Sequence, residues 1–371
     1  MTAALRARFE QHASEHGARS PLYAEICRAV AGDDDTLSLM LHAPEHQRRP
    51  TLLQAAIHDL LLAGAAHELA AHVPTVAGGR AGPRAGARAA APLALDFCRE
   101  HRAELARALA TRSTQTNEVN RAAVLLPALV HAVPRGGGVR LVELGASAGL
   151  NLLLDRFSYR YGGSAAVPGG RVTCDCAVRG ELPPLYPLPL IAERIGVDLE
   201  PVDLRDAAAR RWLLACVWPD EPERVARLRA AIVLARREPP TVVRGDGRAL
   251  LAELVGSASD VHAVIWHSWV LAYWSESEQR ALAGAIDELG ADRDLTWVYL
   301  EQPSETPGLP TPVVAGARHE PGDAALVVAS YRHGKRTIAR LADAHGHLHH
   351  MRWLTTSRGV PGPAPRCAVP T

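Results

Sequence analysis

The prediction of the fold rests mainly on the stretch Glu143-Leu-Gly-Ala-Ser-Ala-Gly-Leu-Asn151. Residues 139–144 (VRLVEL) are rich in β-forming side chains and are bounded by glycines, which predicts a strand, and residues 148–157 are predicted to form a helix. Small residues between a strand and a helix let the backbone approach a ligand closely, and the start of the helix offers unpaired N–H groups. The turn therefore predicts a ligand site that includes Glu143, Gly145, Ser147 and Gly149.

Two specific motifs fit this turn. One is the glycine loop E-x-G-x-G-x-G of class I methyltransferases, with Ser147 in place of the central glycine and Glu143 placed to contact a ribose or an ammonium group. The other is the nucleophile elbow G-x-S-x-G, with Ser147 as the nucleophile. An elbow follows several earlier strands, whereas the sequence before Val139 is predicted to be helical, so position favours the cofactor loop. A tight turn without a ligand is the remaining alternative.

The sequence after the turn alternates between strand-like and helix-like segments. Strands are predicted at residues 241–244, 261–266 and 295–300, and helices at residues 249–255 and 276–289. Such alternation predicts an α/β fold with a doubly wound, largely parallel, Rossmann-like sheet. Strands predicted at residues 325–331, 336–341 and 347–354 are separated by His-Gly turns, which indicates antiparallel C-terminal strands.

The sequence before residue 114 is predicted to be helical. Residues 51–71 carry the broad apolar stripe of a buried helix, and residues 93–110 are predicted to form another. Residues 76–92 are rich in Gly, Ala and Arg, which predicts a flexible surface loop. We expect an all-helical N-terminal domain over residues 1–113 and a Rossmann-like, methyltransferase-type domain over residues 114–371, with an insertion near residues 162–192.

Acidic residues follow two later strands. Asp198 ends a strand-like segment and is a candidate acceptor for ribose hydroxyl groups. Gly245 and Asp246 follow the third predicted strand, where Asp246 can accept a hydrogen bond from an adenine amino group. Either acid alone is more often a helix N-cap, but both follow the glycine loop in the expected order. A long segment precedes Asp198, so residues 157–161 are an alternative second strand.

Polar residues at further strand ends are candidates for chemistry. His267 is a candidate general base for an acceptor hydroxyl or amine, because histidine titrates near neutral pH, and a structural hydrogen bond at the sheet edge explains it equally well. Glu118 is the second candidate catalytic residue. Arg121 is a candidate carboxylate clamp. The predicted substrate-contacting residues are Gln115, Asn117, Arg121, Ser268, Tyr273 and Glu301.

Several of these segments together resemble a known protein family. They are residues 52–71, 115–119 with Arg121, 143–152, 212–219, 243–246, 267–268 and 270–273, and the resemblance covers nearly the whole chain. The chain resembles an uncharacterised, mainly actinobacterial family that is placed among the class I S-adenosylmethionine-dependent methyltransferase-like folds. The resemblance implies that fold and S-adenosylmethionine as the cofactor. It implies no substrate, because the family has no assigned reaction.

The composition excludes several classes of function. The 371 residues contain 41 Lys+Arg and 40 Asp+Glu, a net charge of +1, so charge gives no case for a nucleic-acid partner or an anionic membrane surface. Lys335 is the only lysine, so no Gly-Lys-Ser/Thr phosphate loop exists. No apolar run reaches the roughly 20 residues of a membrane span, and the scattered cysteines are typical of free thiols in a reducing compartment. We expect a cytoplasmic protein with a small-molecule substrate.

His345, His347 and His349 alternate along a predicted strand, a spacing that can bind a metal. No matching carboxylate or cysteine cluster accompanies them in the sequence, so a surface hairpin is favoured and no metal is predicted. The favoured function is methyl transfer from S-adenosylmethionine to a small molecule. The alternatives are a non-catalytic nucleoside-binding protein on a degenerate methyltransferase fold and a serine hydrolase that uses Ser147.

Overall fold

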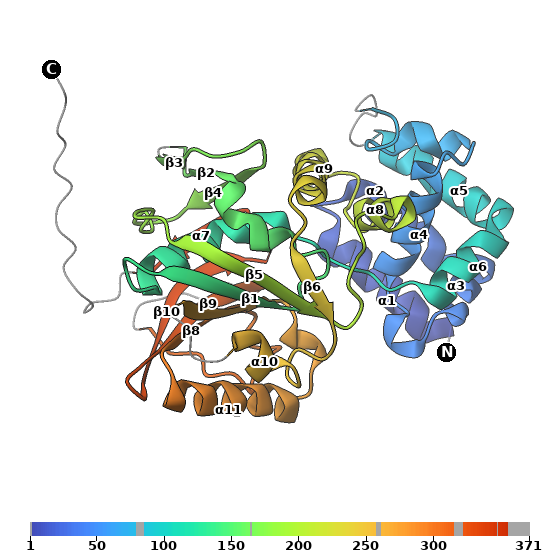
Figure 1. Cartoon of the computed structure of the whole chain (residues 1–371). Helices are drawn as coiled ribbons and strands as arrows, with labels where there is room; N and C mark the ends of the chain where they lie inside the picture. Colours follow the sequence, from blue (N-terminus) through green and yellow to red (C-terminus); the bar gives the residue numbers. More distant parts are fainter. Residues whose placement is uncertain are drawn as a thin grey trace, which may run out of the picture. The chain divides into compact units, whose positions relative to one another are not determined.

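In the computed structural model, the chain is an α/β protein with a large mixed sheet and many helices (Figure 1). The structure describes residues 2–78, 85–163, 165–256, 261–314, 322–346 and 348–354. Contacts divide the chain into two units. The first unit comprises Met1–Val119, Ala146–Leu153 and Asp198–Arg244, and the second comprises Asn120–Gly145, Leu154–Val197 and Gly245–Thr371. Each unit therefore combines segments that are far apart in the sequence.

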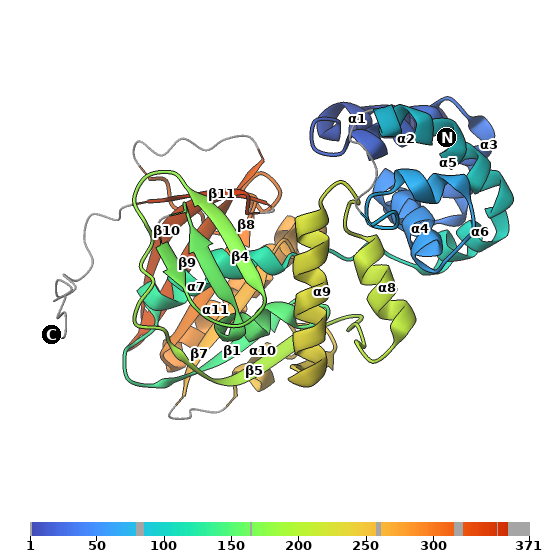
Figure 2. The same cartoon turned by 90° about the horizontal axis from the view of Figure 1, so that it is seen from above.

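The first unit consists mainly of helices around one hydrophobic core. Its elements are α1 (Thr2–His16), α2 (Pro21–Ala31), α3 (Asp34–Leu39), η1 (Met40–His42), η2 (Glu45–Gln47), α4 (Pro50–Leu62), η3 (Glu68–His72), α5 (Ala85–Glu100), α6 (Arg102–Thr111), α8 (Ala207–Ala215), α9 (Pro222–Arg237) and β6 (Thr241–Arg244). α8 and α9 lie side by side (Figure 2). Phe9, Leu52 and Phe97 are buried in this core together with Trp212 of α8, so the later segment is part of the same core. Among the described residues, no helix has both the length and the apolar character needed to cross a bilayer.

Some helix boundaries in this unit differ from the prediction. The helix predicted over residues 51–71 ends at Leu62, and Gly64 follows with a φ of +97°, a conformation that ends helices. The loop predicted over residues 76–92 is wrong in its second half, because α5 begins at Ala85, and residues 79–84 lie outside the described residues. The helix predicted over residues 93–110 is divided between α5 and α6.

The second unit contains most of the strands. They are β1 (Gly138–Leu144), β2 (Ser158–Tyr161), β3 (Ala165–Val167), β4 (Thr173–Val178), β5 (Leu190–Asp198), β7 (His262–Ser268), β8 (Leu295–Glu301), β9 (Asp323–Arg332), β10 (Lys335–His345) and β11 (His350–Trp353). Their spatial order is β3-β2-β4-β11-β10-β9-β8-β7-β1-β5. β5, β1, β7 and β8 run parallel, and β9, β10 and β11 continue the sheet as antiparallel neighbours. The α/β class that the alternating pattern predicted is confirmed.

β1 lies between β7 and β5. Val142 of β1 lies opposite Ile195 of β5, whereas β2 pairs with β3 and β4. The alternative prediction of a strand over residues 157–161 is confirmed by β2, but its expected place next to β1 is wrong, because β2 lies near the far edge of the sheet. β3 and β4 come from the segment 162–192 that was predicted as an insertion, and they extend the far edge of the sheet.

Helices cover both faces of this sheet. α10 (Leu251–Val255) and α11 (Glu276–Asp292) lie on one face, and α7 (Ala122–Ala132) lies on the other (Figure 1). Val142, Ile265 and Trp297 share a hydrophobic core with residues of α10 and α11. Because side chains alternate along a strand, the residues directly before and after each of these three positions point to the face away from α11.

Candidate functional site

The predicted site residues are divided between the two units. The first unit contains Gln115, Asn117, Glu118, Ser147, Gly149 and Asp198. The second unit contains Arg121, Glu143, Gly145, Gly245, Asp246, His267, Ser268, Tyr273 and Glu301. Within each unit, hydrogen bonds connect some of these residues and leave others apart.

In the first unit, Ser147 is the centre of a hydrogen-bond network. Its backbone N–H donates to Asp198 Oδ2 at 2.8 Å. Its hydroxyl donates to Gln115 Oε1 at 2.6 Å and accepts from Asn117 Nδ2 at 2.7 Å. The second oxygen of Asp198 accepts the N–H of Glu200 at 2.8 Å, so backbone amides engage both carboxylate oxygens. Four predicted site residues are therefore brought together, with their polar atoms directed at one another.

The helix predicted over residues 148–157 is not present as an α-helix. The segment is the 3₁₀ element η5 (Leu150–Arg156), which is interrupted at the non-helical Leu153. The turn therefore does not lead into a long helix with free N–H groups at its start. Ser147 has a φ of +51°, and Asp198 satisfies its N–H. The N–H of Ser147 is therefore bonded within the protein.

The hydroxyl of Ser147 is hydrogen-bonded to two amide side chains, whereas the hydroxyl of a nucleophilic serine is hydrogen-bonded to a base. Hydrolytic serines are activated by a basic side chain, most often histidine, that is hydrogen-bonded to the hydroxyl. Among the described residues, the side chains bonded to Ser147 Oγ are those of Gln115 and Asn117. Neither amide accepts a proton at neutral pH. In this arrangement Ser147 connects two side chains and is not activated.

Glu118 is 2% exposed and belongs to a buried ion pair. Its Oε2 lies 2.7 Å from Nε of Arg224, and its Oε1 lies 4.0 Å from Arg227. Burial lowers the pKa of Arg224, but the charges of Glu118 and Glu221 outweigh burial and raise that pKa above its ordinary value. Both carboxylate oxygens of Glu118 thus lie near arginines of α9, and removing one partner of a buried pair would leave an uncompensated charge.

In the second unit, Gly145 directly follows β1 with a φ of +69°. A Cβ at this position would lie 2.4 Å from Cγ2 of Val270, so both the backbone conformation and the available space require glycine. Gly145 is exposed, whereas Glu143 is buried and accepts a hydrogen bond from Nε1 of Trp266 at 3.2 Å. The turn thus presents accessible backbone close to a buried carboxylate.

His267 lies in β7 and is fully buried. Its Nδ1 is 2.8 Å from Glu301 Oε1, and its Nε2 is 3.0 Å from Nε1 of Trp297. The ring stacks on Tyr299, with an angle of 2° between the ring planes. Because the indole N–H only donates, Nε2 accepts, and Nδ1 carries the proton that is donated to Glu301. Both ring nitrogens are therefore occupied.

Glu301 connects β8 to the loop that follows β7. Its Oε1 also accepts the N–H of Val270 at 3.1 Å. Its Oε2 is buried and has no hydrogen-bond partner among the described residues, and the same holds for Ser268 Oγ and Trp269 Nε1. Buried polar atoms without a partner are uncommon, since leaving them unpaired costs free energy. Each of these atoms is therefore a candidate contact for a polar group of a ligand.

Trp269 was not among the predicted site residues. Its φ is +56°, and a bulky residue in this conformation is an outlier of the kind that clusters at functional sites. Gly346 makes room for it, because a Cβ there would lie 2.7 Å from the indole ring. The sequence feature that could have identified Trp269 is its position directly after His267 and Ser268, at the end of a strand.

The pleat of the sheet separates these polar residues. His267 lies opposite Tyr299, which packs in the core with α11, so His267 and Glu301 point to that face. Glu143 and Ser268 point to the opposite face. There the buried Arg121 donates to the backbone carbonyl of Ser268 at 3.0 Å. In the second unit, the side chains of His267 and Glu301 therefore lie on one face of the sheet. Those of Glu143 and Ser268 lie on the other face.

Gly245 and Asp246 lie in the turn before α10. Asp246 Oδ1 accepts the N–H of Arg248 at 2.9 Å, and the Asp246 side chain is 44% exposed. Tyr273, at the end of η6 (Leu271–Tyr273), is 71% exposed. In contrast to His267, Asp246 and Tyr273 are accessible from solvent.

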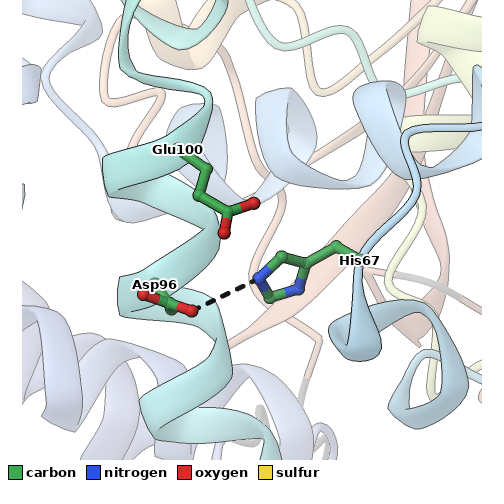
Figure 3. Close-up of side chains that lie close together, drawn as sticks. All are labelled: His67, Asp96 and Glu100. Atoms are coloured by element: carbon green, nitrogen blue, oxygen red, sulfur yellow. Dashed lines mark ion pairs between the residues drawn. The ribbon is translucent and has the colours of Figure 1, made fainter.

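His67, Asp96 and Glu100 of the first unit bring one possible metal-ligating atom each within 4.8 Å of the others (Figure 3). Asp96 and Glu100 are one turn apart on α5, and His67 Nε2 lies 3.8 Å from Asp96 Oδ2. The Nδ1 of His67 accepts the N–H of Leu69 at 3.0 Å, so Nε2 carries the proton of the neutral ring. A metal needs the Nε2 lone pair, so this geometry suits a histidine–carboxylate contact.

The alternating histidines near the C-terminus are described only in part. His347 lies outside the described residues, and the rings of His345 and His349 lie 4.8 Å apart at an angle of 41°. The possible metal site of the three histidines is therefore known only from their spacing in the sequence.

Comparison with known proteins gives a match to a bacterial protein family. A model of a protein family matches residues 6–353 and is described as an uncharacterised protein conserved in bacteria (DUF2332). The comparisons with curated proteins and with solved structures gave no match. The family match extends over segments of both units.

Proposed function

This chain belongs to the DUF2332 family of uncharacterised bacterial proteins, and we propose that it binds S-adenosylmethionine and transfers the methyl group to a small molecule. The strand order carries the proposal: β1 lies between β5 and β7, so the chain continues first to one side of β1 and later to the other. Ligands of open α/β sheets bind at the carboxyl ends of the strands where the order reverses in this way. β1 ends at that position with Glu143 and Leu144, and Gly145 follows it directly.

The second-unit residues at this edge fit a nucleoside cofactor. Gly145 exposes its backbone without a side chain, which allows a ligand to approach closely. Asp246 has an accessible carboxylate that can accept a hydrogen bond from an adenine amino group. Ser268 Oγ and Trp269 Nε1 are buried polar atoms that a bound molecule can satisfy.

When bound, S-adenosylmethionine supplies an electrophilic methyl group on its sulfonium. The protein contributes position and the exclusion of water. Glu301 holds the loop after β7 through the N–H of Val270 and the imidazole of His267. In this proposal His267 and Glu301 are positioning residues, since both nitrogens of His267 are used within the protein.

A non-catalytic nucleoside-binding protein is the second candidate. One observation favours it over methyl transfer. His267, the expected base, has no free ring nitrogen. Both candidates require binding of the nucleoside, and only the first requires transfer.

Isothermal titration with S-adenosylmethionine and S-adenosylhomocysteine tests the proposal. We expect saturable binding of both, and an Asp246→Ala variant that binds about tenfold to a hundredfold more weakly, because one hydrogen bond to a charged group is lost. Asp292→Ala is the matched control, because Asp292 is an exposed acid at the end of α11. Its affinity should equal that of the unchanged protein.

The outcomes separate the candidates. Absence of binding of either nucleoside contradicts both methyl transfer and nucleoside sensing. Binding without transfer of a labelled methyl group to any acceptor in a metabolite extract supports the non-catalytic candidate. Labelling of Ser147 by a fluorophosphonate, abolished in Ser147→Ala, supports the hydrolase instead.

A further inference from the structure

The first unit contains a pocket of about 470 Å³ that none of the predicted site residues lines. It is bounded by Ala148, by residues 201–205, which follow β5, by the C-terminal end of α9, and by residues 239–242, which lead into and begin β6. All of its lining residues belong to the first unit. Small-molecule pockets in proteins measure about 300–1,000 Å³, so this volume suits a compact organic ligand.

The walls of the pocket are apolar and rigid. Of its eleven lining residues eight are apolar, and these include Pro201, Pro239 and Pro240. Proline and alanine side chains lose almost no conformational entropy when a ligand binds, so the walls need no ordering. Hydrogen bonds fix the loop: the N–H of Val202 donates to the carbonyl of Ser147 at 3.1 Å, and Arg210 donates to the carbonyl of Leu204 at 2.7 Å. The pocket is therefore largely preformed.

The charges at the pocket leave one cation available. Its charged lining residues are Asp203, Arg205 and Arg236. Asp203 and Arg205 neutralise each other, with Oδ1 of Asp203 3.0 Å from Nε of Arg205. Arg236 lies exposed in the last turn of α9, and within the described part of the chain it has no hydrogen-bond or ion-pair partner. One guanidinium is thus free beside an apolar, preformed wall.

We propose that this pocket binds a small apolar carboxylate, an acid with an aromatic or alicyclic body. Arg236 would pair with the carboxylate, because the planar guanidinium matches two carboxylate oxygens. The proline and valine walls would cover the ring, where burial of apolar surface supplies the affinity. A single available cation favours a monoanion over a phosphate ester. The proposal is independent of methyl transfer, because it rests on a pocket made entirely by the first unit.

Isothermal titration of the full chain with 1-naphthoate and 1-naphthamide tests this assignment. The two probes share the ring and differ in charge, so we expect the acid to bind about tenfold more tightly than the amide. Arg236→Gln should weaken 1-naphthoate binding by about the same factor and leave 1-naphthamide binding unchanged, and Arg236→Lys should retain part of the affinity. Arg237→Gln is the matched control, because Arg237 is the next exposed arginine of α9 and does not line the pocket.

Three results would overturn the proposal. One is equal affinity for the acid and the amide. Another is equal weakening by Arg236→Gln and Arg237→Gln, which would indicate attraction by surface charge in general. The third is no saturable binding of 1-naphthoate at millimolar concentration. Circular dichroism of the variants tests whether they fold. We expect that they do, because both arginines are exposed.

Discussion

Gly145 and Gly136 share an unusual backbone conformation but differ in their surroundings. Their φ values are +69° and +91°. A Cβ on Gly136 would meet nothing within 4 Å, whereas a Cβ on Gly145 would overlap Val270. We predict that Gly136→Ala lowers the free energy of unfolding by about 1 kcal/mol, the cost of the backbone conformation alone. Gly145→Ala should cost roughly 2–4 kcal/mol, because overpacking is added.

Urea unfolding of the two alanine variants measures this difference. Adding Val270→Ala to Gly145→Ala should recover part of the lost stability, because the overlapping methyl groups are removed. Equal destabilisation by Gly136→Ala and Gly145→Ala would show that the contact with Val270 does not matter, and it would contradict this account of the turn.

The sequence identified the polar residues around the turn but not their partners. Ser147 and Asp198 were selected because each follows a predicted strand, and the structure brings them within 2.8 Å of each other. Spacing along the chain carries no information about an N–H group that pairs with a carboxylate 51 residues away. Trp269 was missed for a related reason, since its positive φ is a property of the folded loop.

At the scale of secondary-structure elements, His58 joins α4 to the end of α8. Its Nδ1 lies 3.1 Å from the carbonyl of Ala215, and its Nε2 lies 2.7 Å from Oγ1 of Thr75. Burial lowers the pKa of His58 from 6.5 to about 4. Between these two pH values the unfolded chain binds a proton that the folded chain does not. Stability is therefore lost as the pH falls from 6.5 towards 4.

We predict that the free energy of unfolding decreases on acidification from pH 7 to pH 4.5, with about 2 kcal/mol of the decrease due to His58. In His58→Gln this part of the pH dependence should disappear, because glutamine does not titrate. Urea midpoints at the two pH values provide the measurement. If the variant is less stable at pH 7 yet keeps the full pH dependence of the unchanged protein, His58 is not the titrating group.

β1, β7, β8 and α11 were predictable because each is long enough to show its period. α5 was not, since its first half contains Gly86 and Pro92 and has the composition of a loop. Alanine has the highest helix propensity, and Ala87, Ala90 and Ala94 are buried in the core of the first unit. Packing of these alanines outweighs the cost of the glycine and the proline. The short η5 shows the reverse case, in which a helix-like pattern forms only irregular 3₁₀ turns.

At the scale of the whole molecule, the two units contain interleaved segments. Trp212 packs in the core of the N-terminal helices, and its Nε1 donates to the carbonyl of Ser113 at 2.9 Å. Contacts of this kind group residues 198–244 with the first 119 residues. Composition and periodicity describe one segment at a time, so they predicted the elements of both units and not how distant segments combine.

The most direct test of the proposed cofactor site is hydrogen–deuterium exchange with and without S-adenosylhomocysteine. The strand order and the exposed Gly145 predict that the nucleoside slows exchange in peptides covering residues 245–250 and 268–273 of the second unit, which contain Asp246 and Trp269. Asp246→Ala should weaken this protection at the same ligand concentration, because the variant binds the nucleoside more weakly. Unchanged exchange in both peptides, at a concentration that saturates binding, would contradict a nucleoside site at the carboxyl ends of these strands.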